Sequence, residues 1–183
     1  MNYILPVATA LIALSACAPG AAILSSNVAS PISVGTAQLK SPQGAHLGTF
    51  ELEVDGNQLT GNLTVDMEPG EVHAWHLHSV GRCDAPEFTS AGGHLNPEGK
   101  SHGKLSPYGK HLGDLPNMII GSDGRGELSV VISENAPIAL SQIFDADGAA
   151  VMLHQSADDY RSDPAGAAGR RIACGVLIPH SAR

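Results

Sequence analysis

Residues 46–66 have the sequence HLGTFELEVDGNQLTGNLTVD, in which polar and apolar side chains alternate on either side of Asp55-Gly56-Asn57. Alternation with a period of two is typical of a strand that buries one face, and Asp-Gly between two such runs is a turn signal. The stretch therefore predicts two antiparallel strands, at 46–54 and 58–66, joined by a tight turn.

Alternation of polar and apolar residues, typical of strands, continues on both sides of this hairpin. No segment has a convincing helical pattern. The segment 81–117 is instead dense in Gly, Pro, His and Ser, and a loop of that length in a compact domain is normally functional or disordered. A second irregular loop is predicted at 157–170. About eight strands and two long loops predict an antiparallel barrel or sandwich. The further predicted strands are 34–40, 72–78, 118–120, 126–133, 150–154 and 172–178.

The composition suits one domain without nucleic acid as a partner. The chain has 183 residues with 21 Gly, 12 Pro and an aromatic fraction of only 4%, in keeping with short strands and many turns. Ten Lys and Arg against eighteen Asp and Glu give a net charge of −8. A field of that sign repels phosphate, so we expect no nucleic-acid binding through the general field of the protein.

The N-terminus has the pattern of an export signal. Residues 3–16 carry no charge and are rich in Ile, Leu, Val and Ala; the run falls short of the roughly 20 residues that span a bilayer but suits a signal-peptide core. Leu14-Ser15-Ala16-Cys17 is similar to the lipobox of bacterial lipoproteins, in which Cys17 becomes the lipidated N-terminus. Ordinary secretion and a retained membrane anchor are the alternatives. The predicted organisation is a lipoprotein-type signal peptide at 1–17, a flexible tether at 18–33 and one domain at 34–183.

The three cysteines agree with export. If lipid takes Cys17, Cys83 and Cys174 remain as an even pair in an oxidising compartment, where a disulfide can persist. The alternative is two unrelated buried thiols. We expect the protein in the periplasm or elsewhere in the cell envelope, in contact with the membrane only through a lipid anchor on Cys17.

Nine histidines are the most unusual feature of the composition. His76 and His78 lie two apart on a predicted strand, so their side chains point to the same face, as two ligands of one metal must. The polar loop at 81–117 contains more candidates, and metal ligation would supply the ordering energy that apolar burial does not. Three imidazoles and a carboxylate make a plausible closed zinc set, while a second set of mostly strand imidazoles suits copper. The loop candidates are His94, His102, His111 and Asp114.

Five segments, in this order along the chain, resemble the signature segments of copper–zinc superoxide dismutases. The resemblance extends from about residue 34 to residue 178 and implies an eight-stranded Greek-key antiparallel β-barrel, sandwich-like, with two long functional loops. The segments are HAWHLH at 73–78, TSAGGHLNP at 89–97, HLGDL at 111–115, HQSADD at 154–159 and AGRRIACGV at 168–176.

The resemblance implies one role for each of seven metal ligands. Copper would be held by four imidazoles and zinc by three imidazoles and one carboxylate, with the ring of His94 shared by both metals. The implied copper ligands are His76, His78, His94 and His154, and the implied zinc ligands are His94, His102, His111 and Asp114.

Other residues match supporting positions of the family. Cys83 and Cys174 match its intrachain disulfide. Arg171 matches the arginine beside the open copper position, and the neighbouring Arg170 is the alternative in that register. Asp158 matches a carboxylate that links the copper ligand His76 to the zinc ligand His102, as outer carboxylates fix the orientation of ligating histidines; a solvated loop acid is the alternative, and is the preferred interpretation of Asp159.

The implied activity is the conversion of superoxide to O₂ and H₂O₂ by alternate reduction and reoxidation of copper, with His94 as proton carrier and Arg171 as anion-docking group. One alternative is a copper- and zinc-binding or buffering protein of the same fold without turnover. A zinc hydrolase would need an open zinc position, and an inert barrel would leave buried imidazoles without purpose.

The sequence is compatible with a monomer and with a homodimer.

Some positions depart from the family pattern or lie outside the ligand set. Ala74 stands where the family commonly has Gly, and Trp75 where it usually has Phe, which changes packing beside the copper strand. The second loop is shorter than in well-known eukaryotic members and has few Lys. We expect His73 to be structural, and His46 and His180 to be surface residues.

Overall fold

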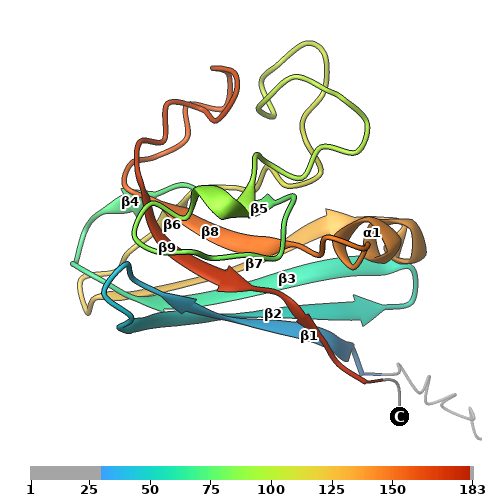
Figure 1. Ribbon diagram of the computed structural model, residues 1–183, viewed down its shortest axis with the longest axis horizontal. Coiled ribbons are helices and arrows are strands. Elements are labelled where there is room, and N and C mark those ends of the chain that lie inside the picture. The colour runs from blue at the N-terminus through green and yellow to red at the C-terminus, as the bar shows by residue number, and fades with distance from the viewer. Residues whose placement is uncertain (1–29, 182–183) are drawn as a thin grey trace, which may run out of the picture.

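The computed structural model describes residues 30–181 (Figure 1). The predicted signal peptide, its lipidation site Cys17 and most of the predicted tether lie outside the described residues. Among residues 30–181, no helix has the length and apolar character needed to cross a membrane. The two ends of the described chain lie side by side, because the carbonyl of Val34 accepts a hydrogen bond from the amide of His180 at 2.8 Å.

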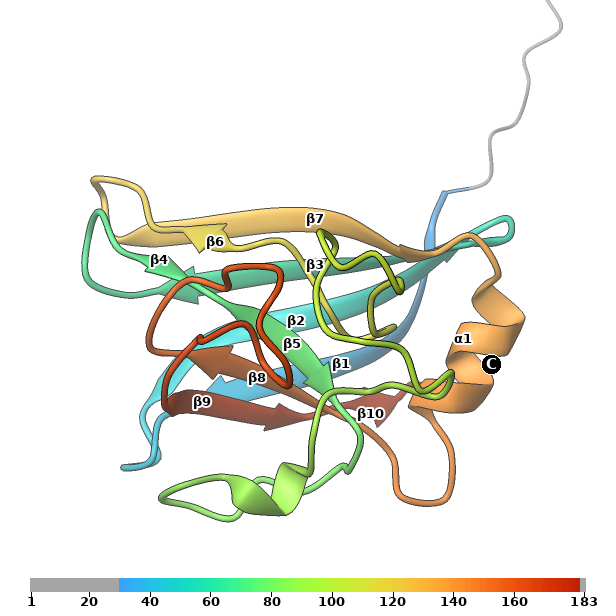
Figure 2. The ribbon, with the colours of Figure 1, turned by 90° about the horizontal axis from the view of Figure 1, so that it is seen from above.

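Eight strands form one antiparallel sheet in the order β5-β8-β9-β1-β2-β3-β7, with β10 added to β1. The sheet curls over on itself, with β5 and β8 above β1 and β2 (Figures 1 and 2). Strand β3 pairs with β7 and not with the next strand along the chain, a crossover of the kind that a Greek key requires. The predicted sandwich-like antiparallel barrel is confirmed. The strands are β1 Ile32–Lys40, β2 His46–Asp55, β3 Gln58–Asp66, β4 Val72–His73, β5 Trp75–His78, β6 Met118–Ile119, β7 Arg125–Ser133, β8 Ala150–His154, β9 Arg171–Val176 and β10 Ile178–Pro179.

The predicted β2–β3 hairpin is confirmed. Asp55 pairs with Gln58 at the turn, and Gly56 has a φ of 59°, a left-handed conformation that costs least for a residue without Cβ. Alternate residues of both strands are buried, as the period of two requires.

The core lies between the two sides of the curled sheet. Trp75 on β5 is fully buried with its ring centroid 5.8 Å from that of Phe50, and its indole nitrogen donates a hydrogen bond to the carbonyl of Pro116 at 2.6 Å. Burying a large apolar side chain contributes about 1.5–3 kcal/mol. Because Trp75 and Leu77 belong to this core, the alternate residues of β5 face the other way, toward the long loops.

The predicted strand at 72–78 is interrupted in the structure. Strand β4 pairs with β6 in a separate two-stranded sheet, whereas β5 pairs with β8. Between them, the amide of Ala74 donates to the carbonyl of Ser156 and its carbonyl accepts from the amide of His154, both at 2.8 Å. Alternation of polar and apolar residues predicts a strand but not its partner, so it does not reveal this change of partner. The predicted strand at 172–178 likewise divides, into β9 and β10.

Helix α1 (Ala136–Ile143) shows that the expectation of no convincing helix was wrong. The Asn135 side chain accepts a hydrogen bond from the amide of Ile138 at 3.4 Å, and Pro137 lies in the first turn, where its missing N–H costs nothing. A helix this short depends on tertiary burial more than on its own propensity, and its period is too brief to stand out in the sequence. The residues that it buries are Ala136, Ala139 and Ile143.

Both long loops lie on the same side of the barrel, beyond β5 and β8 (Figures 1 and 2). The first contains the short 3₁₀ helix η1 (Thr89–Ala91). A disulfide joins Cys83 in this loop to Cys174 in β9, with a Cα–Cα distance of 5.7 Å, which confirms the predicted bond. The loop is thereby tied to the last long strand of the sheet.

Candidate metal centre

Two side chains of β5 point to the same face of the strand, as predicted, and this face is turned away from the core. His76 and His78 occupy alternate positions of the strand, and both are buried beneath the long loops. The backbone of β5 also forms isolated antiparallel bridges to the first loop, from His76 to Asp114 and from His78 to His94. The loop is therefore docked along the same edge that presents the two imidazoles.

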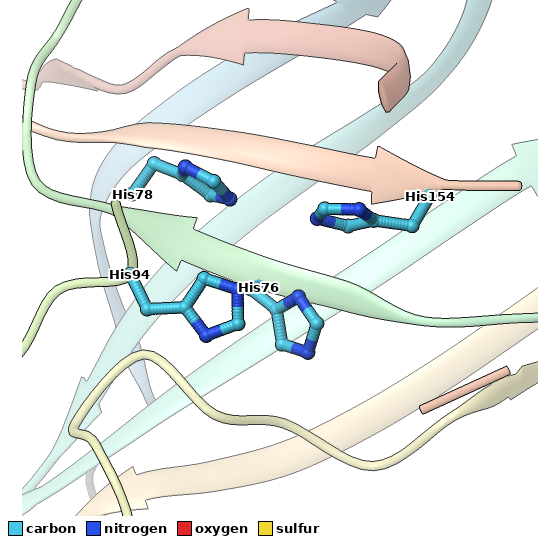
Figure 3. Close-up of side chains that lie close together, drawn as sticks. All are labelled: His76, His78, His94 and His154. Carbon is cyan, nitrogen blue, oxygen red and sulfur yellow. The ribbon is translucent and has the colours of Figure 1, made fainter. Parts of the chain in front are cut away.

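Four imidazoles converge beside β5 and form the group that we call the strand group: His76, His78, His94 and His154 (Figure 3). Each offers one nitrogen, and these four nitrogens lie within 4.8 Å of one another. The rings of His76 and His94 are 3.9 Å apart between centroids. The sequence placed two of these residues on one strand; the fold brings in His94 from the first loop and His154 from the end of β8.

One nitrogen of each strand-group ring is buried without a hydrogen-bond partner among the described residues. A buried polar atom without a partner costs about 1–3 kcal/mol, so four of them in one place require a common explanation. A metal ion that accepts their lone pairs satisfies all four at once, and the residues therefore fit a metal. The four atoms are His76 Nδ1, His78 Nε2, His94 Nε2 and His154 Nε2.

The opposite nitrogen of each ring donates to a fixed oxygen. His78 Nδ1 donates to the carbonyl of Gly92 at 3.0 Å, and His154 Nδ1 to the carbonyl of Gly169 at 3.4 Å. Such outer hydrogen bonds fix the tautomer and the ring orientation of a metal ligand. The other two rings, His76 and His94, donate instead to carboxylates.

Burial keeps the strand-group imidazoles neutral. It lowers the pKa of His78 to about 2 and that of His154 to about 3. Burial also lowers the pKa of His94 to about 4, although a hydrogen bond to the carboxylate of Asp114 opposes the shift. At pH 7 these rings therefore carry no proton on the converging nitrogens, which is the state that binds a metal.

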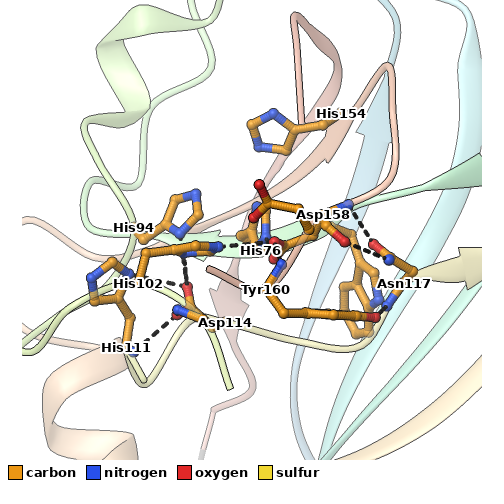
Figure 4. A network of polar contacts seen from close by, with 12 residues as sticks. His76, His94, His102, His111, Asp114, Asn117, His154, Asp158 and Tyr160 are labelled. Carbon is orange, nitrogen blue, oxygen red and sulfur yellow. Dashed lines mark hydrogen bonds and ion pairs between the residues drawn. The ribbon is translucent and has the colours of Figure 1, made fainter. Parts of the chain in front are cut away.

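A second cluster, the loop group, consists of His94, His102, His111 and Asp114, all from the first long loop (Figure 4). The Nδ1 atoms of the three rings lie 2.8, 3.0 and 3.0 Å from one carboxylate oxygen, Oδ1 of Asp114. The other oxygen, Oδ2, accepts hydrogen bonds from the amides of Gly103 and His111 at 2.7 and 3.0 Å. Three imidazoles and one carboxylate match a closed tetrahedral zinc set.

Proton counting also fits a cation at the loop group. His102 Nδ1 faces Asp114, while its Nε2 faces Oδ1 of Asp158 at 3.0 Å. His111 likewise faces Asp114 through Nδ1 and the carbonyl of Lys100 through Nε2, at 3.0 Å. A neutral imidazole carries only one N–H, so acceptors at both nitrogens require an added positive charge, either a proton or a metal ion.

The charges of the loop group are strongly coupled. Burial alone would lower the pKa of His102, but hydrogen bonds to Asp114 and Asp158 outweigh it and raise the pKa to about 9. Burial alone would raise the pKa of Asp114, but hydrogen bonds from His102, His94 and the Gly103 amide hold that pKa well below its usual range. The loop group thus combines a firmly ionised carboxylate with imidazoles aimed at it.

Asp158 joins the two groups. Its Oδ2 accepts from Nε2 of His76 at 3.0 Å and its Oδ1 from Nε2 of His102 at 3.0 Å, and all three side chains are fully buried. The adjacent Asp159 is exposed and accepts hydrogen bonds from Ser162 and the amide of Arg161. The structure therefore places Asp158 between the two groups, as the resemblance implied, and leaves Asp159 in solvent.

Two residues that sequence reasoning did not select hold Asp158 in place (Figure 4). The Asn117 side chain accepts from the Asp158 amide at 2.8 Å and donates to its carbonyl at 3.0 Å. The hydroxyl of Tyr160 accepts from the Asn117 amide at 2.7 Å, and the Tyr160 amide donates to Oδ1 of Asp158 at 2.6 Å. An asparagine after a proline and a loop tyrosine carry no sequence signal for this contact, which depends on how the two loops meet.

The two neighbouring arginines have different surroundings. Arg171 is half-buried and donates from Nη1 to the carbonyl of Phe88 and from Nη2 to that of Gly92, both at 2.6 Å. The Gly92 carbonyl is also the acceptor for His78, so Arg171 lies next to the strand group. Arg170 is exposed and donates from Nε to Oε1 of Gln155 at 3.0 Å.

The remaining histidines stay outside both groups. His73 is buried and its Nδ1 donates to the carbonyl of His154 at 2.9 Å, so it supports the backbone of a strand-group residue. His46 and His180 are exposed. These positions agree with the structural and surface roles expected for them.

Residues 35–177 match the family described as copper/zinc superoxide dismutase (SODC). The chain belongs to the copper/zinc superoxide dismutase family. Copper and zinc are therefore the cofactors of this family, and the two histidine groups are the places in this chain that could bind them. Two groups that share one imidazole agree with a family named for two metals.

Named relatives extend this similarity over most of the chain. Superoxide dismutase [Cu-Zn] 1 of Aquifex aeolicus is 40% identical over 147 residues, which cover 77% of this chain and 85% of that protein. Superoxide dismutase-like protein YojM of Bacillus subtilis is 39% identical over 149 residues, covering 77% and 74%.

Solved structures of this superoxide dismutase family show the same fold. A SOD-like protein from Bacillus subtilis matches with a TM-score of 0.70 and 35% identity, covering 78% of this chain and 97% of that one. Cu/Zn superoxide dismutase from Brucella abortus matches with a TM-score of 0.62 and 27% identity, covering 77% and 97%.

Proposed function

We propose that the protein is a copper–zinc superoxide dismutase that converts superoxide to O₂ and H₂O₂. The observation that carries the proposal is the position of His94, whose Nε2 belongs to the strand group and whose Nδ1 belongs to the loop group. A single ring shared by two unlike donor sets can couple a redox ion to a redox-silent one.

The donor sets support copper at the strand group and zinc at the loop group. Four neutral imidazoles suit copper, which imidazole ligates well, whereas a carboxylate with three imidazoles in a closed tetrahedron suits Zn²⁺. Bound copper would supply one-electron exchange with superoxide, and bound zinc would supply a fixed positive charge. The proposed copper ligands are His76, His78, His94 and His154, and the proposed zinc ligands are His94, His102, His111 and Asp114.

His94 is the proposed proton carrier. Its Nε2 is buried, has no partner among the described residues and lies in the strand group, while its Nδ1 is held by Asp114 at 2.8 Å. Because Nδ1 is engaged in the loop group, a proton taken up on Nε2 faces the strand group and can pass to an acceptor bound there. The ring would keep its orientation during the transfer, because its Nδ1 would be a ligand of the metal in the loop group.

Arg171 is the proposed docking group for the substrate anion. Two backbone carbonyls hold its guanidinium at 2.6 Å each, so the charge is fixed beside His78, and no carboxylate among residues 30–181 forms an ion pair with it. A fixed cation in a half-buried site attracts a small anion more strongly than a mobile surface lysine does.

Two measurements on the purified chain loaded with both metals test this function. Anomalous scattering at the copper and zinc edges should locate copper at the strand group and zinc at the loop group. Superoxide removal should far exceed that of the same concentration of free copper. Full metal occupancy with no activity above free copper would instead support a metal-buffering protein.

We also propose that the protein is exported to the periplasm and anchored by lipid on Cys17. The Cys83–Cys174 disulfide supports export, because such bonds persist in oxidising compartments. The expected mature chain begins with a diacylated Cys17, which mass spectrometry of the membrane fraction would detect, and the Cys17→Ser variant should lose the lipid. Sedimentation of the mature protein distinguishes the monomer from the homodimer.

A further inference from the structure

The ring and the backbone of His102 are held by a segment that contributes no residue to the loop group. His102 belongs to the first long loop, yet its Nε2 donates to Oδ1 of Asp158 at 3.0 Å and its amide donates to Oδ1 of Asp163 at 2.7 Å, both in the second long loop. Among residues 30–181, no other member of the loop group has a hydrogen bond to this second loop. His102 is therefore the residue through which the second loop contacts the loop group.

Gly166, also in the second loop, lies against the hydrogen bond between Asp158 and His102. It is buried, its amide donates to the carbonyl of Ser162 at 2.7 Å, and its carbonyl accepts from the amide of Asp159 at 2.9 Å. A Cβ added at this position would lie 2.7 Å from Nε2 of His102 and would overlap Oδ1 of Asp158, the oxygen that accepts from that nitrogen. The backbone of Gly166 thus fills the space beside this bond and leaves no room for a side chain.

The neighbouring Ala167 shows that the backbone conformation alone does not require a glycine here. Gly166 has a φ of 64°, and Ala167 has a φ of 53° although it carries a Cβ. Ala167 is exposed, so its methyl group has room, whereas Gly166 is buried. The feature that position 166 needs is therefore the missing Cβ, because the hydrogen-bonded pair occupies that space.

Asp163 holds the other side of the same histidine. His102 is fully buried, and a buried amide requires a hydrogen-bond partner, which the exposed carboxylate of Asp163 supplies. Within the described part of the chain, this is the only hydrogen bond of that carboxylate. With the amide and Nε2 both held, Nδ1 stays directed at Oδ1 of Asp114, 3.0 Å away.

We infer that Gly166 and Asp163 are positioning residues for the proposed zinc ligand His102. Gly166 leaves room for the Asp158–His102 hydrogen bond and covers it, and both side chains of that bond are fully buried. A hydrogen bond shielded from water is electrostatically stronger than an exposed one. The zinc affinity of the loop group is thereby set in part by a loop that supplies no zinc ligand. The inference rests on the proposed assignment of zinc to the loop group.

The zinc affinities of two alanine variants test the role of Gly166. G166A places a Cβ against the bond, so competition with a chelator should show zinc binding weakened about 10–100-fold, as is typical when a ligand loses its outer partner. G99A is the matched control, because Gly99 has the same φ of 64° but a Cβ there would meet no atom within 4 Å. It shares the strain of a left-handed alanine without the overlap and should change zinc affinity less than about twofold. Equal losses in the two variants would overturn the role of Gly166.

Substitutions of Asp163 test the same inference without added side-chain volume. D163A removes the acceptor of the His102 amide and should weaken zinc binding about tenfold. D163N keeps an oxygen that can accept this bond and should retain most of the affinity. Because the Asp163 carboxylate has no hydrogen bond to the strand group among the described residues, copper affinity in D163A should stay within about twofold of the wild type. Equal losses of copper and zinc affinity would indicate a general loosening of the loop and contradict the inference.

The imidazole proton of His102 gives a readout that needs no turnover. In the reduced holoprotein both metals are diamagnetic, so the signal of the proton on Nε2 can be followed by NMR. We expect this proton to exchange slowly with solvent in the wild type and in G99A, because the bond to Asp158 is buried, and at least about tenfold faster in G166A. An unchanged exchange rate in G166A would contradict the inference even in an active enzyme. A protein that meets these expectations but does not remove superoxide would refute the proposed activity and leave the inference standing.

Discussion

The strand group and the loop group are held by different parts of the molecule. The strand group relies on β5 and β8, whose positions are set by a hydrophobic core that includes Trp75 and Leu77. The loop group comes entirely from a polar segment, and its side chains are held mainly by the carboxylate of Asp114. A site built on strands is formed by folding itself, whereas a site built on a loop also shapes the loop.

The largest expected effect is on amide exchange after the metals are removed by chelation. Without a metal, the loop between His94 and Asp114 keeps apolar contacts mainly through Leu95 and Leu112 at its two ends. We therefore expect the protection factors of the polar residues between them to fall on the order of 100-fold. The amides of β5 and β8 should change far less, because the core holds them. Hydrogen–deuterium exchange of the holo and metal-free proteins measures both regions in one experiment, and an equal loss in both would erase the proposed distinction.

Asp158→Asn should lower the metal affinity of both the strand group and the loop group. The variant keeps the shape of the side chain but loses the charge that orients His76 and His102, and loss of such an outer partner typically costs about 10–100-fold in metal affinity. Competition with chelators gives the affinities for copper and zinc separately. Asp159→Asn is the matched control, since that side chain is exposed and reaches neither group. An effect confined to one metal would show that Asp158 does not couple the groups.

Arg171→Ile should keep metal bound in both groups. It should slow superoxide removal by about one to two orders of magnitude, because the fixed docking charge is lost. The dependence of the rate on ionic strength should also weaken. Metal analysis and stopped-flow kinetics give the two readouts. A variant that binds both metals and turns over at the wild-type rate would remove Arg171 from the mechanism.

The smallest expected effect is the pH dependence of the stability of the metal-free protein. The folded-state pKa of His102 is raised to about 9, so its stabilising contribution is complete below its unfolded pKa of about 6.5 and is lost as pH rises through 9. We expect a loss of about 2 kcal/mol between pH 7.5 and 9.5. The histidines of the strand group, whose pKa values are lowered, are neutral in both states above about pH 7.5 and do not contribute there.

Urea unfolding of the metal-free protein at pH 7.5, 8.5 and 9.5 measures this loss, and His102→Gln should flatten the profile. Stability that stays constant across the window in the wild type would contradict the raised pKa of His102.

Much of the barrel could be predicted from local pattern alone. Alternation around Asp55-Gly56-Asn57 predicted the β2–β3 hairpin, because strand period and turn chemistry are properties of neighbouring residues. The same reasoning failed where distant contacts decide the conformation. Helix α1 is too short for its period to stand out, and the strand at 72–78 changes partner at Ala74 because that backbone pairs with Ser156 and His154.

The sequence by itself determined which side chains could bind a metal and that two of them, His76 and His78, share a strand face. The family resemblance implied that the two groups share His94 and that Asp158 links them. Only the tertiary structure decided that Asn117 and Tyr160 hold Asp158 in place. The physical reason is that imidazole spacing along one strand follows from backbone geometry. A contact between residues 82 apart, such as His76 and Asp158, exists only after the core has fixed β5 and the second long loop has folded over it.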